Sequence, residues 1–193
     1  MHIIFYGPEG SGKSTQAKLL SEKLNVPALV SGDLVRKYAK EDKGIMGDTC
    51  REVFKTGHYV PDSEMFVLWK HRLKEPDTGK GFVIDGFPRN LDQVKFLEEK
   101  LEKYNKKEDV VFFLKVSEKE SIKRLLKRGR KSPDGSLHDT PEKIKERLKR
   151  YKKEEKQVLK FYKKKRLLRI INGEQSIKEI HNDIMEIIKK YDC

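Results

Sequence analysis

Cysteine is scarce in this sequence, and its cysteines lie far apart. The 193 residues include only two, Cys50 and Cys193, and no pair has the C-x-x-C spacing. A disulfide framework or a zinc site built on cysteine pairs needs more cysteines at closer spacing. We therefore expect no structural zinc, a buried thiol at Cys50 and a frayed end at Cys193.

Long hydrophobic runs are also missing. No apolar stretch approaches the roughly 18 residues that a membrane-spanning helix requires. The first residues lack the charged and then apolar pattern of a signal peptide and already look like a strand. These absences predict no membrane association, and we expect a cytoplasmic protein.

Acidic residues are outnumbered by basic ones, 31 against 44, which gives a net charge of +13. Such an excess is compatible with a polyanionic partner. Much of it, however, falls in helical stretches such as residues 142–166, where Glu and Lys are mixed as on a solvated helix surface. No stacking-aromatic motif or nucleic-acid module is present, so we expect no specific nucleic-acid partner.

Five short apolar runs are continuous rather than alternating, which is typical of strands buried on both faces of a parallel sheet. They are residues 2–6, 27–31, 81–85, 109–116 and 167–171. Amphipathic segments lie between or after them, at residues 13–24, 91–103, 118–128 and 176–190. This alternation predicts a single α/β domain over residues 1–193, with a five-stranded parallel sheet flanked by helices.

Two segments depart from the simple alternation. Residues 32–80 contain no clear strand, only helical pieces interrupted by glycines, and residues 129–140 are polar with two glycines and a proline. We interpret the first as an inserted helical subdomain and the second as a mobile loop. Asp33, close to the start of the insertion, is suited to cap a helix.

Residues 7–15, GPEGSGKST, match the phosphate-binding P-loop pattern G-x-x-x-x-G-K-[ST] between a predicted strand and a predicted helix. Glycines let successive backbone N–H groups point at phosphate oxygens, and the helix adds its positive end. Lys13 supplies a charge near the β- and γ-phosphates, and the Ser14 hydroxyl can bind Mg²⁺. Asp85 ends a predicted strand and either approaches the same ion or caps the turn before Gly86.

A second group of polar residues predicts where the phosphoryl group goes. Arg36 follows the Ser31-Gly32-Asp33 segment, and a second phosphate is a natural partner for it. Arg89 lies beyond a strand end, where ligands of such sheets bind, and Gln93 follows four residues later on the same helix face. No N-K-x-D-like guanine signature is present, which argues against a GTPase.

Five motifs occur in an order that resembles the adenylate kinase family, from residue 2 to about residue 190. They are GPEGSGKST (7–15), SGDLVR (31–36), G-x-Y-V-P-D (57–62), DGFPRNLDQ (85–93) and RL-x-x-Y (147–151). The resemblance implies Mg²⁺-dependent, reversible conversion of ATP and AMP into two ADP, and a role in nucleotide homeostasis. It also implies an NMP-binding insertion at 31–60 and a short LID at 129–139, with the remainder as the core.

The resemblance further implies which residues act. For ATP these are Gly10, Ser11, Gly12, Lys13, Ser14, Thr15, Arg128 and, through its backbone, Gln175. For AMP they are Ser31, Arg36, His58, Tyr59, Val60, Gly86, Phe87, Pro88, Arg89, Gln93 and Arg147. The catalytic charges would be Lys13, Arg36, Arg89, Arg124, Arg128 and Arg147, with Ser14 and Asp85 at Mg²⁺, partly through water.

The LID departs from the family pattern, which has an arginine shortly before an Asp-Asp pair. Here Ser136 stands at the arginine position and His138 at the first aspartate, so that only Asp139 remains. Either Arg130 or Lys131 replaces the missing charge from the other side of the loop, or the enzyme is slower or has altered substrate use. We interpret His138 as a solvated loop histidine rather than a ligand.

Three rival functions stay open. A UMP/CMP kinase shares the reaction, but that family tends to have Asn at the position of Gln93 and lacks an aspartate at that of Asp62, so both residues favour AMP. A basic nucleic-acid-associated ATPase is more remote, and a nucleotide sensor without turnover is a third possibility. We expect ATP, AMP and ADP as partners of a monomer.

Overall fold

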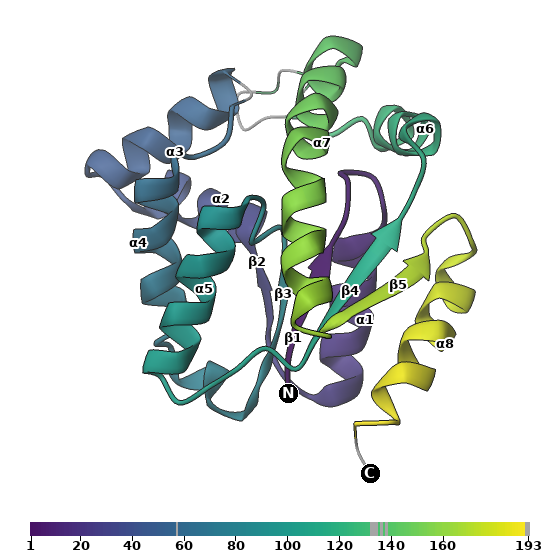
Figure 1. Ribbon diagram of the computed structural model, residues 1–193. Coiled ribbons are helices and arrows are strands. Elements are labelled where there is room, and N and C mark those ends of the chain that lie inside the picture. The colour runs from purple at the N-terminus through teal and green to yellow at the C-terminus, as the bar shows by residue number, and fades with distance from the viewer. Residues whose placement is uncertain (57, 132–134, 136, 138, 192–193) are drawn as a thin grey trace.

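The computed structural model describes residues 1–56, 58–131, 135, 137 and 139–191. Five strands form one sheet in the order β2-β3-β1-β4-β5, and every pairing is parallel (Figure 1). The strands are β1 (His2–Tyr6), β2 (Ala28–Val30), β3 (Phe82–Asp85), β4 (Val110–Lys115) and β5 (Leu168–Asn172). The predicted five-stranded parallel sheet is confirmed, with limits within about one residue of the apolar runs.

Helices occupy most of the remaining described chain. They are α1 (Lys13–Leu24), α2 (Ser31–Glu41), α3 (Ile45–Thr56), α4 (Asp62–Arg72), α5 (Leu91–Lys103), α6 (Glu118–Arg128), α7 (Pro141–Lys164), α8 (Ile177–Ile188) and a short 3₁₀ helix at Pro76–Lys80. Side-chain oxygens of Asn90, Ser117, Thr140 and Ser176 cap four of them by accepting backbone N–H groups. The limits predicted for α1, α5 and α6 are confirmed, and α8 is slightly shorter than predicted.

The core lies on both faces of the sheet. Ile3 and Phe5 of β1 pack with α1 and α8, whereas Ile4 and Tyr6 face the side of α4, α5 and α7 (Figure 1). All four of these side chains are at most 3% exposed. Burial on both faces explains why the strand sequences are continuous apolar runs rather than alternating patterns.

The segment predicted to lack strands does so over its described residues and consists of α2, α3, α4 and the 3₁₀ helix. Helices α2 and α3 pack against each other beside the carboxyl ends of the strands (Figure 1). The interpretation of Asp33 as a cap was wrong. Helix α2 begins at Ser31 with Val30 as its N-cap, so Asp33 lies inside the first turn and pairs with Arg36.

The polar segment after α6 begins at Gly129, which ends that helix with a φ of 53°. Lys131 and Leu137 form an antiparallel bridge, and Thr140 caps α7. Ser136 and His138, on which the LID interpretation depended, lie outside the described residues, as does Cys193. Cys50 is buried with a free thiol, as predicted.

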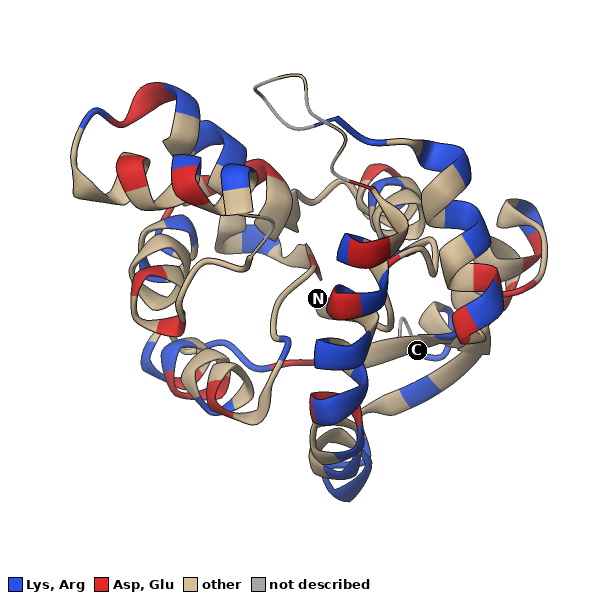
Figure 2. Cartoon of the chain, turned by 90° about the horizontal axis from the view of Figure 1, so that it is seen from above, with Lys and Arg blue, Asp and Glu red and all other residues tan. Residues whose placement is uncertain are grey.

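Charge is spread over the surface rather than collected in one stripe. Figure 2 shows Lys and Arg interspersed with Asp and Glu along most of the helices. Exposed pairs such as Lys18–Glu22 and Arg150–Glu146 place opposite charges one helical turn apart. In the described part of the chain, no helix is both long and apolar enough to cross a membrane.

Candidate active site

A cavity with a volume of about 740 Å³ lies at the carboxyl ends of the strands. Segments that follow β1, β2 and β3 line it, together with the end of α6 and the start of α7. Ligands of open parallel sheets bind at this edge, because the loops that leave neighbouring strands converge there. A second cavity of about 270 Å³ shares Glu9, Lys13, Tyr59, Arg89 and Gln93 with the first.

The loop between β1 and α1 has the backbone that the glycines predict. Gly7, Gly10 and Gly12 have φ values of 143°, 84° and 95°. A Cβ at Gly7 would lie 2.7 Å from the Leu114 carbonyl oxygen, so the close packing of the loop on β4 also requires glycine. The loop thus turns directly into the first turn of α1, whose N–H groups are available to an anion.

Lys13, the first residue of α1, reaches back over this loop. Its ammonium donates to the carbonyl oxygens of Gly7 and Pro8, each at 2.7 Å. Burial lowers the pKa of Lys13, and the nearby carboxylates of Asp85 and Glu9 oppose that shift. The ammonium therefore lies at the cavity wall, held by backbone oxygens that a phosphate oxygen can replace as acceptors.

Ser14 and Asp85 form the part of the site suited to a divalent cation. The Ser14 hydroxyl donates to Asp85 Oδ2 at 2.5 Å, and Asp85 Oδ1 is buried without a hydrogen-bond partner among the described residues. A hydroxyl and a carboxylate are hard oxygen ligands, which Mg²⁺ prefers, and Mg²⁺ commonly combines few protein ligands with phosphates and water. In the same described residues, no group of three or more His, Cys, Asp or Glu is placed to hold a metal ion.

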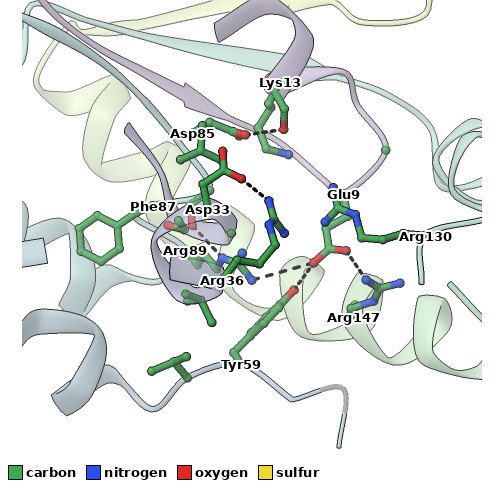
Figure 3. Close-up of a pocket in the computed structure, with 18 of the residues that line it drawn as sticks. Glu9, Lys13, Asp33, Arg36, Tyr59, Asp85, Phe87, Arg89, Arg130 and Arg147 are labelled. Atoms are coloured by element: carbon green, nitrogen blue, oxygen red, sulfur yellow. Dashed lines mark hydrogen bonds and ion pairs between the residues drawn. The ribbon is translucent and has the colours of Figure 1, made fainter. Parts of the chain in front are cut away.

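Glu9 lies at the centre of a cluster of basic and aromatic side chains (Figure 3). It accepts a hydrogen bond from the Tyr59 hydroxyl at 2.8 Å and forms ion pairs with Arg147 at 2.9 Å and with Arg89 at 3.9 Å. Burial alone would raise the pKa of Glu9, but Arg147, Arg89 and Tyr59 hold it below its ordinary value. Glu9 is therefore a carboxylate that joins the P-loop, the segment before α4 and α7.

Asp139 joins the two helices that flank the polar loop. Its carboxylate accepts from Arg128 Nε at 2.9 Å, Arg128 Nη2 at 3.1 Å and Arg147 Nη2 at 2.8 Å. Burial by itself raises the pKa of Asp139, but the hydrogen bonds from Arg128 and Arg147 bring it down to about 2. This buried carboxylate fixes the positions of two arginines at the cavity wall.

Three further arginines reach the cavity from different elements. Arg36 pairs with Asp33 on α2, Arg124 on α6 donates to the Gly173 carbonyl oxygen at 2.8 Å, and Arg130 follows α6. Figure 3 shows Arg36 and Arg130 on the same cavity as Glu9. Burial, and next the charges of Arg128 and Arg36, lower the pKa of Arg130, so several cations share a confined volume.

Gln93 forms a network with the start of α4. Its Nε2 donates to Asp62 Oδ1 at 2.7 Å, and its Oε1 accepts from the backbone N–H of Arg89 at 2.8 Å. Asn90 donates to the other Asp62 oxygen at 2.7 Å, while its own Oδ1 accepts from the Gln93 N–H at 2.8 Å. Gln93 is only 5% exposed, yet it lines both cavities.

Most of the residues that the sequence singled out line the larger cavity. They are Gly10, Gly12, Lys13, Ser14, Thr15, Ser31, Arg36, His58, Tyr59, Val60, Asp85, Gly86, Phe87, Arg89, Gln93, Arg124, Arg128 and Arg147. Pro88 lines the second cavity, and the Ser11 hydroxyl accepts from Lys13 at 3.3 Å. Gln175 lines neither cavity, and its side-chain amide donates to Asp183 at 2.7 Å, so its backbone contact with ATP stays a prediction.

Sequence reasoning missed the role of Glu9 and of Asp139. Glu9 occupies a variable position of the P-loop pattern, and its partners Tyr59 and Arg147 lie 50 and 138 residues away. In the sequence, Asp139 stands out only as the remaining aspartate of the family motif. The contacts of Glu9 have no local signal because they span long separations, and those of Asp139 depend on how α6 and α7 are placed.

Comparisons with known proteins agree with this geometry. The family model described as adenylate kinase matches residues 5–167. Curated relatives named adenylate kinase include that of Leptospira biflexa, 39% identical over 96% of this chain and 98% of its own length. Those of Prochlorococcus marinus (38% identical; 96% of this chain, 97% of the relative) and Methanocella arvoryzae (37% identical; 98% and 99%) are similar. The chain belongs to the adenylate kinase family.

Proposed function

We propose that the larger cavity binds ATP on the side of the P-loop and AMP between α2 and α5, and that the protein transfers the γ-phosphoryl group reversibly between them. One observation supports this arrangement above all. Lys13, Ser14 and Asp85 line the same cavity as Arg36, Arg89 and Gln93. A site for a triphosphate and a site for a second phosphate with a base therefore share one volume.

On the ATP side, the proposal assigns the phosphates to the backbone N–H groups of residues 10–15 and to the Lys13 ammonium. Arg128 lines the same cavity and adds a second cation, held in place by Asp139. Ser14 and Asp85 hold Mg²⁺, directly or through water, and the ion neutralises charge on the phosphoryl oxygens. The orphan Oδ1 of Asp85 supports this assignment.

On the AMP side, Arg36 and Arg89 bind the phosphate and Gln93 binds the adenine edge. The Ser31 hydroxyl supports a polar ligand here, because it lines the cavity, is 1% exposed and has no hydrogen-bond partner among the described residues. Apolar neighbours provide the surface for the sugar and the base. They include Val60 and Phe87, with His58, Tyr59, Gly86 and Pro88 as further contacts.

The transfer itself needs position and charge more than covalent help. An AMP phosphate oxygen attacks the γ-phosphorus, and the bond to the β–γ bridging oxygen breaks, so that both nucleotides become ADP. Positive charge converges on that point from Lys13, Arg36, Arg89, Arg124, Arg128 and Arg147. Interactions that strengthen as charge moves in the transition state lower the barrier.

The proposal includes two moving parts, the NMP-binding insertion at residues 31–60 and the LID at residues 129–139. Their closure would exclude water from the transferred group, and their opening would release product. Within the LID we assign to Arg130 the charge that the family places at the position of Ser136. Arg130 lines the cavity, whereas Lys131 does not.

We further infer that the enzyme acts as a monomer in the cytoplasm, where it balances adenine nucleotides. All the proposed site residues come from one chain, so one copy suffices for the reaction. Gel filtration with light scattering at working concentration tests this point, and a stable trimer would contradict it.

Substitution of the P-loop lysine tests the proposed function directly. Lys13→Met should abolish ADP formation from ATP and AMP, because the apolar side chain removes the cation at the β- and γ-phosphates. Lys23→Met in the last turn of the same helix, outside the cavity, is the matched control and should retain activity. Retained ADP formation in Lys13→Met, with an unchanged melting temperature, would refute the proposal.

A further inference from the structure

The amide of Gln93 is held in one orientation by two partners of opposite kind. Asp62 is a carboxylate and can only accept, so it fixes Nε2 on its side at 2.7 Å. The Arg89 backbone N–H can only donate, so it fixes Oε1 on the other side at 2.8 Å. Turning the amide by 180° would lose both hydrogen bonds and place like groups against each other, so the partners determine the orientation.

Asp62 is itself held in place. Its second oxygen accepts from Asn90 Nδ2 at 2.7 Å, and the orientation of Asn90 is fixed because its Oδ1 caps α5 at the Gln93 N–H. The chain of constraints therefore runs from the helix cap through Asn90 and Asp62 to Gln93. Each member has a defined donor or acceptor role, which is how buried polar networks specify one arrangement.

Two hydrogen-bonding positions of Gln93 remain for a ligand. An amide has two N–H donors and two acceptor lone pairs, and the network uses one of each. One N–H and one lone pair therefore remain on an amide that lines the larger cavity. They match a base edge that offers one acceptor and one amino donor in the corresponding order.

Adenine has this edge, because its N1 accepts and its 6-amino group donates. Hypoxanthine and guanine reverse both roles, since N1–H donates and O6 accepts. A freely rotating glutamine could satisfy either kind of edge by turning over. A glutamine fixed in one orientation can satisfy only the amino kind, and unpaired buried polar groups penalise the other.

We propose that Asp62, acting through Gln93, is the positioning residue by which the acceptor site selects 6-amino over 6-oxo purine monophosphates. This inference rests on the proposed role of Gln93 as the residue that contacts the acceptor base. Asp62 does not need to touch the nucleotide. Asp62 fixes the orientation of the Gln93 amide, and that orientation decides which base edge Gln93 can bind.

Asp62→Asn is the sharpest test because of Asn90. Asn90 donates to residue 62, so the new side chain would turn its oxygen to Asn90 and its amide nitrogen to Gln93. Gln93 would then face a donor at both ends and lose its fixed orientation. The ratio of kcat/KM for AMP to kcat/KM for IMP, with MgATP as donor, should fall about tenfold or more, the scale of one misplaced buried hydrogen bond.

Asp92→Asn is the matched control, because this exposed carboxylate lies in the first turn of α5 without a contact to Gln93. Its AMP-to-IMP ratio should equal that of the wild type. If Asp62→Asn lowers kcat/KM equally for both acceptors, Asp62 has only a structural role and the proposal is wrong. Binding affinities of the wild-type protein give a test that does not depend on the folding of a variant. AMP should bind at least about tenfold more tightly than IMP, and equal affinities would overturn the proposal.

Gln93→Ala distinguishes the proposed role of Asp62 from the proposed role of Gln93 on which it rests. It should remove the AMP-to-IMP preference, and adding Asp62→Asn to it should change the ratio no further. An unchanged preference in Gln93→Ala would show that Gln93 does not contact the base. The proposed role of Gln93 as the base contact and that of Asp62 as its positioning residue would then fail together. A preference lost in Gln93→Ala but kept in Asp62→Asn would leave the role of Gln93 intact and refute that of Asp62.

Discussion

Arg147 contacts a carboxylate on each side of its guanidinium, and the two carboxylates lie in different surroundings. Asp139 is fully buried against Arg147 and Arg128 and does not line the cavity. Glu9 is 24% exposed and lines both cavities. A carboxylate enclosed by arginines mainly stabilises the fold, whereas one at the cavity wall also acts on the charge of any bound nucleotide. The same pairing chemistry is thus enclosed on one side of Arg147 and faces the proposed nucleotide site on the other.

The largest effect should come from the enclosed carboxylate. Asp139→Asn keeps the size of the side chain but removes the charge that two arginines share, and loss of one partner from a buried pair costs about 3 kcal/mol. Urea unfolding monitored by circular dichroism measures the change. Asp48→Asn, which breaks an exposed pair with Arg51, should cost about 0.5 kcal/mol. Equal losses in the two variants would contradict the structural role of Asp139.

The acid dependence of stability sharpens the same contrast. The pKa of Asp139 in the folded protein, about 2, lies below the value of about 3.9 for an unfolded aspartate. Its contribution is therefore complete above about pH 4 and is lost as the pH falls towards 2. The difference in unfolding free energy between the wild type and Asp139→Asn should shrink over this interval. A difference that stays constant down to pH 2 would be inconsistent with a carboxylate of depressed pKa.

Substitution of Arg130 tests whether a residue that contacts Asp139 through its backbone also contributes to the reaction through its side chain. Its backbone N–H donates to Asp139 at 3.1 Å, while its side chain lines the cavity. Arg130→Ala should lower kcat about tenfold, since one cation of several is lost near the phosphates. Lys131→Ala, the neighbouring exposed cation, should leave kcat unchanged. Equal and negligible losses in steady-state assays would remove Arg130 from the proposed site.

The smallest effect should come from substitution of Glu9, and this change should improve AMP binding rather than impair the protein. Glu9→Gln keeps a hydrogen-bond acceptor for Tyr59 but removes a negative charge from the cavity wall. The KM for AMP should fall about fivefold, as expected for about 1 kcal/mol of relieved repulsion. Glu102→Gln, an exposed charge on α5, controls for net charge. A KM that rises instead would mean that Glu9 chiefly positions Arg147 and Arg89.

The sheet and the P-loop could be predicted because their signals are local. Continuous apolar runs mark the strands at 2–6 and 81–85, and the glycine spacing marks the loop at residues 7–15. Capping was less predictable. Asp33 has the right residue type, but the chain turns into α2 two residues earlier, so the carboxylate meets Arg36 instead.

The contacts within the site could not be predicted from the sequence alone. Glu9 and Asp62 lie inside recognised motifs and Asp139 lies just before α7, but the partners of all three are set by how α4, α5, α6 and α7 converge. Motif matching predicts most of the residues that line the cavity. It does not identify the carboxylates that hold those residues in position, because the partners of these carboxylates are set by tertiary packing.

The Asp139 carboxylate also closes a ring in the chain. It accepts the Arg130 N–H, and the Asp139 N–H donates to the Arg130 carbonyl oxygen at 3.3 Å, so both ends of the intervening segment are joined at its base. Doubling the length of a flexible closed segment costs only about 0.6 kcal/mol in closure entropy. Insertions between Arg130 and Asp139 should therefore leave the positions of Arg128 and Arg147 unchanged. The proposed LID is in this sense an interchangeable module, onto which longer segments could be grafted without moving Arg128 and Arg147.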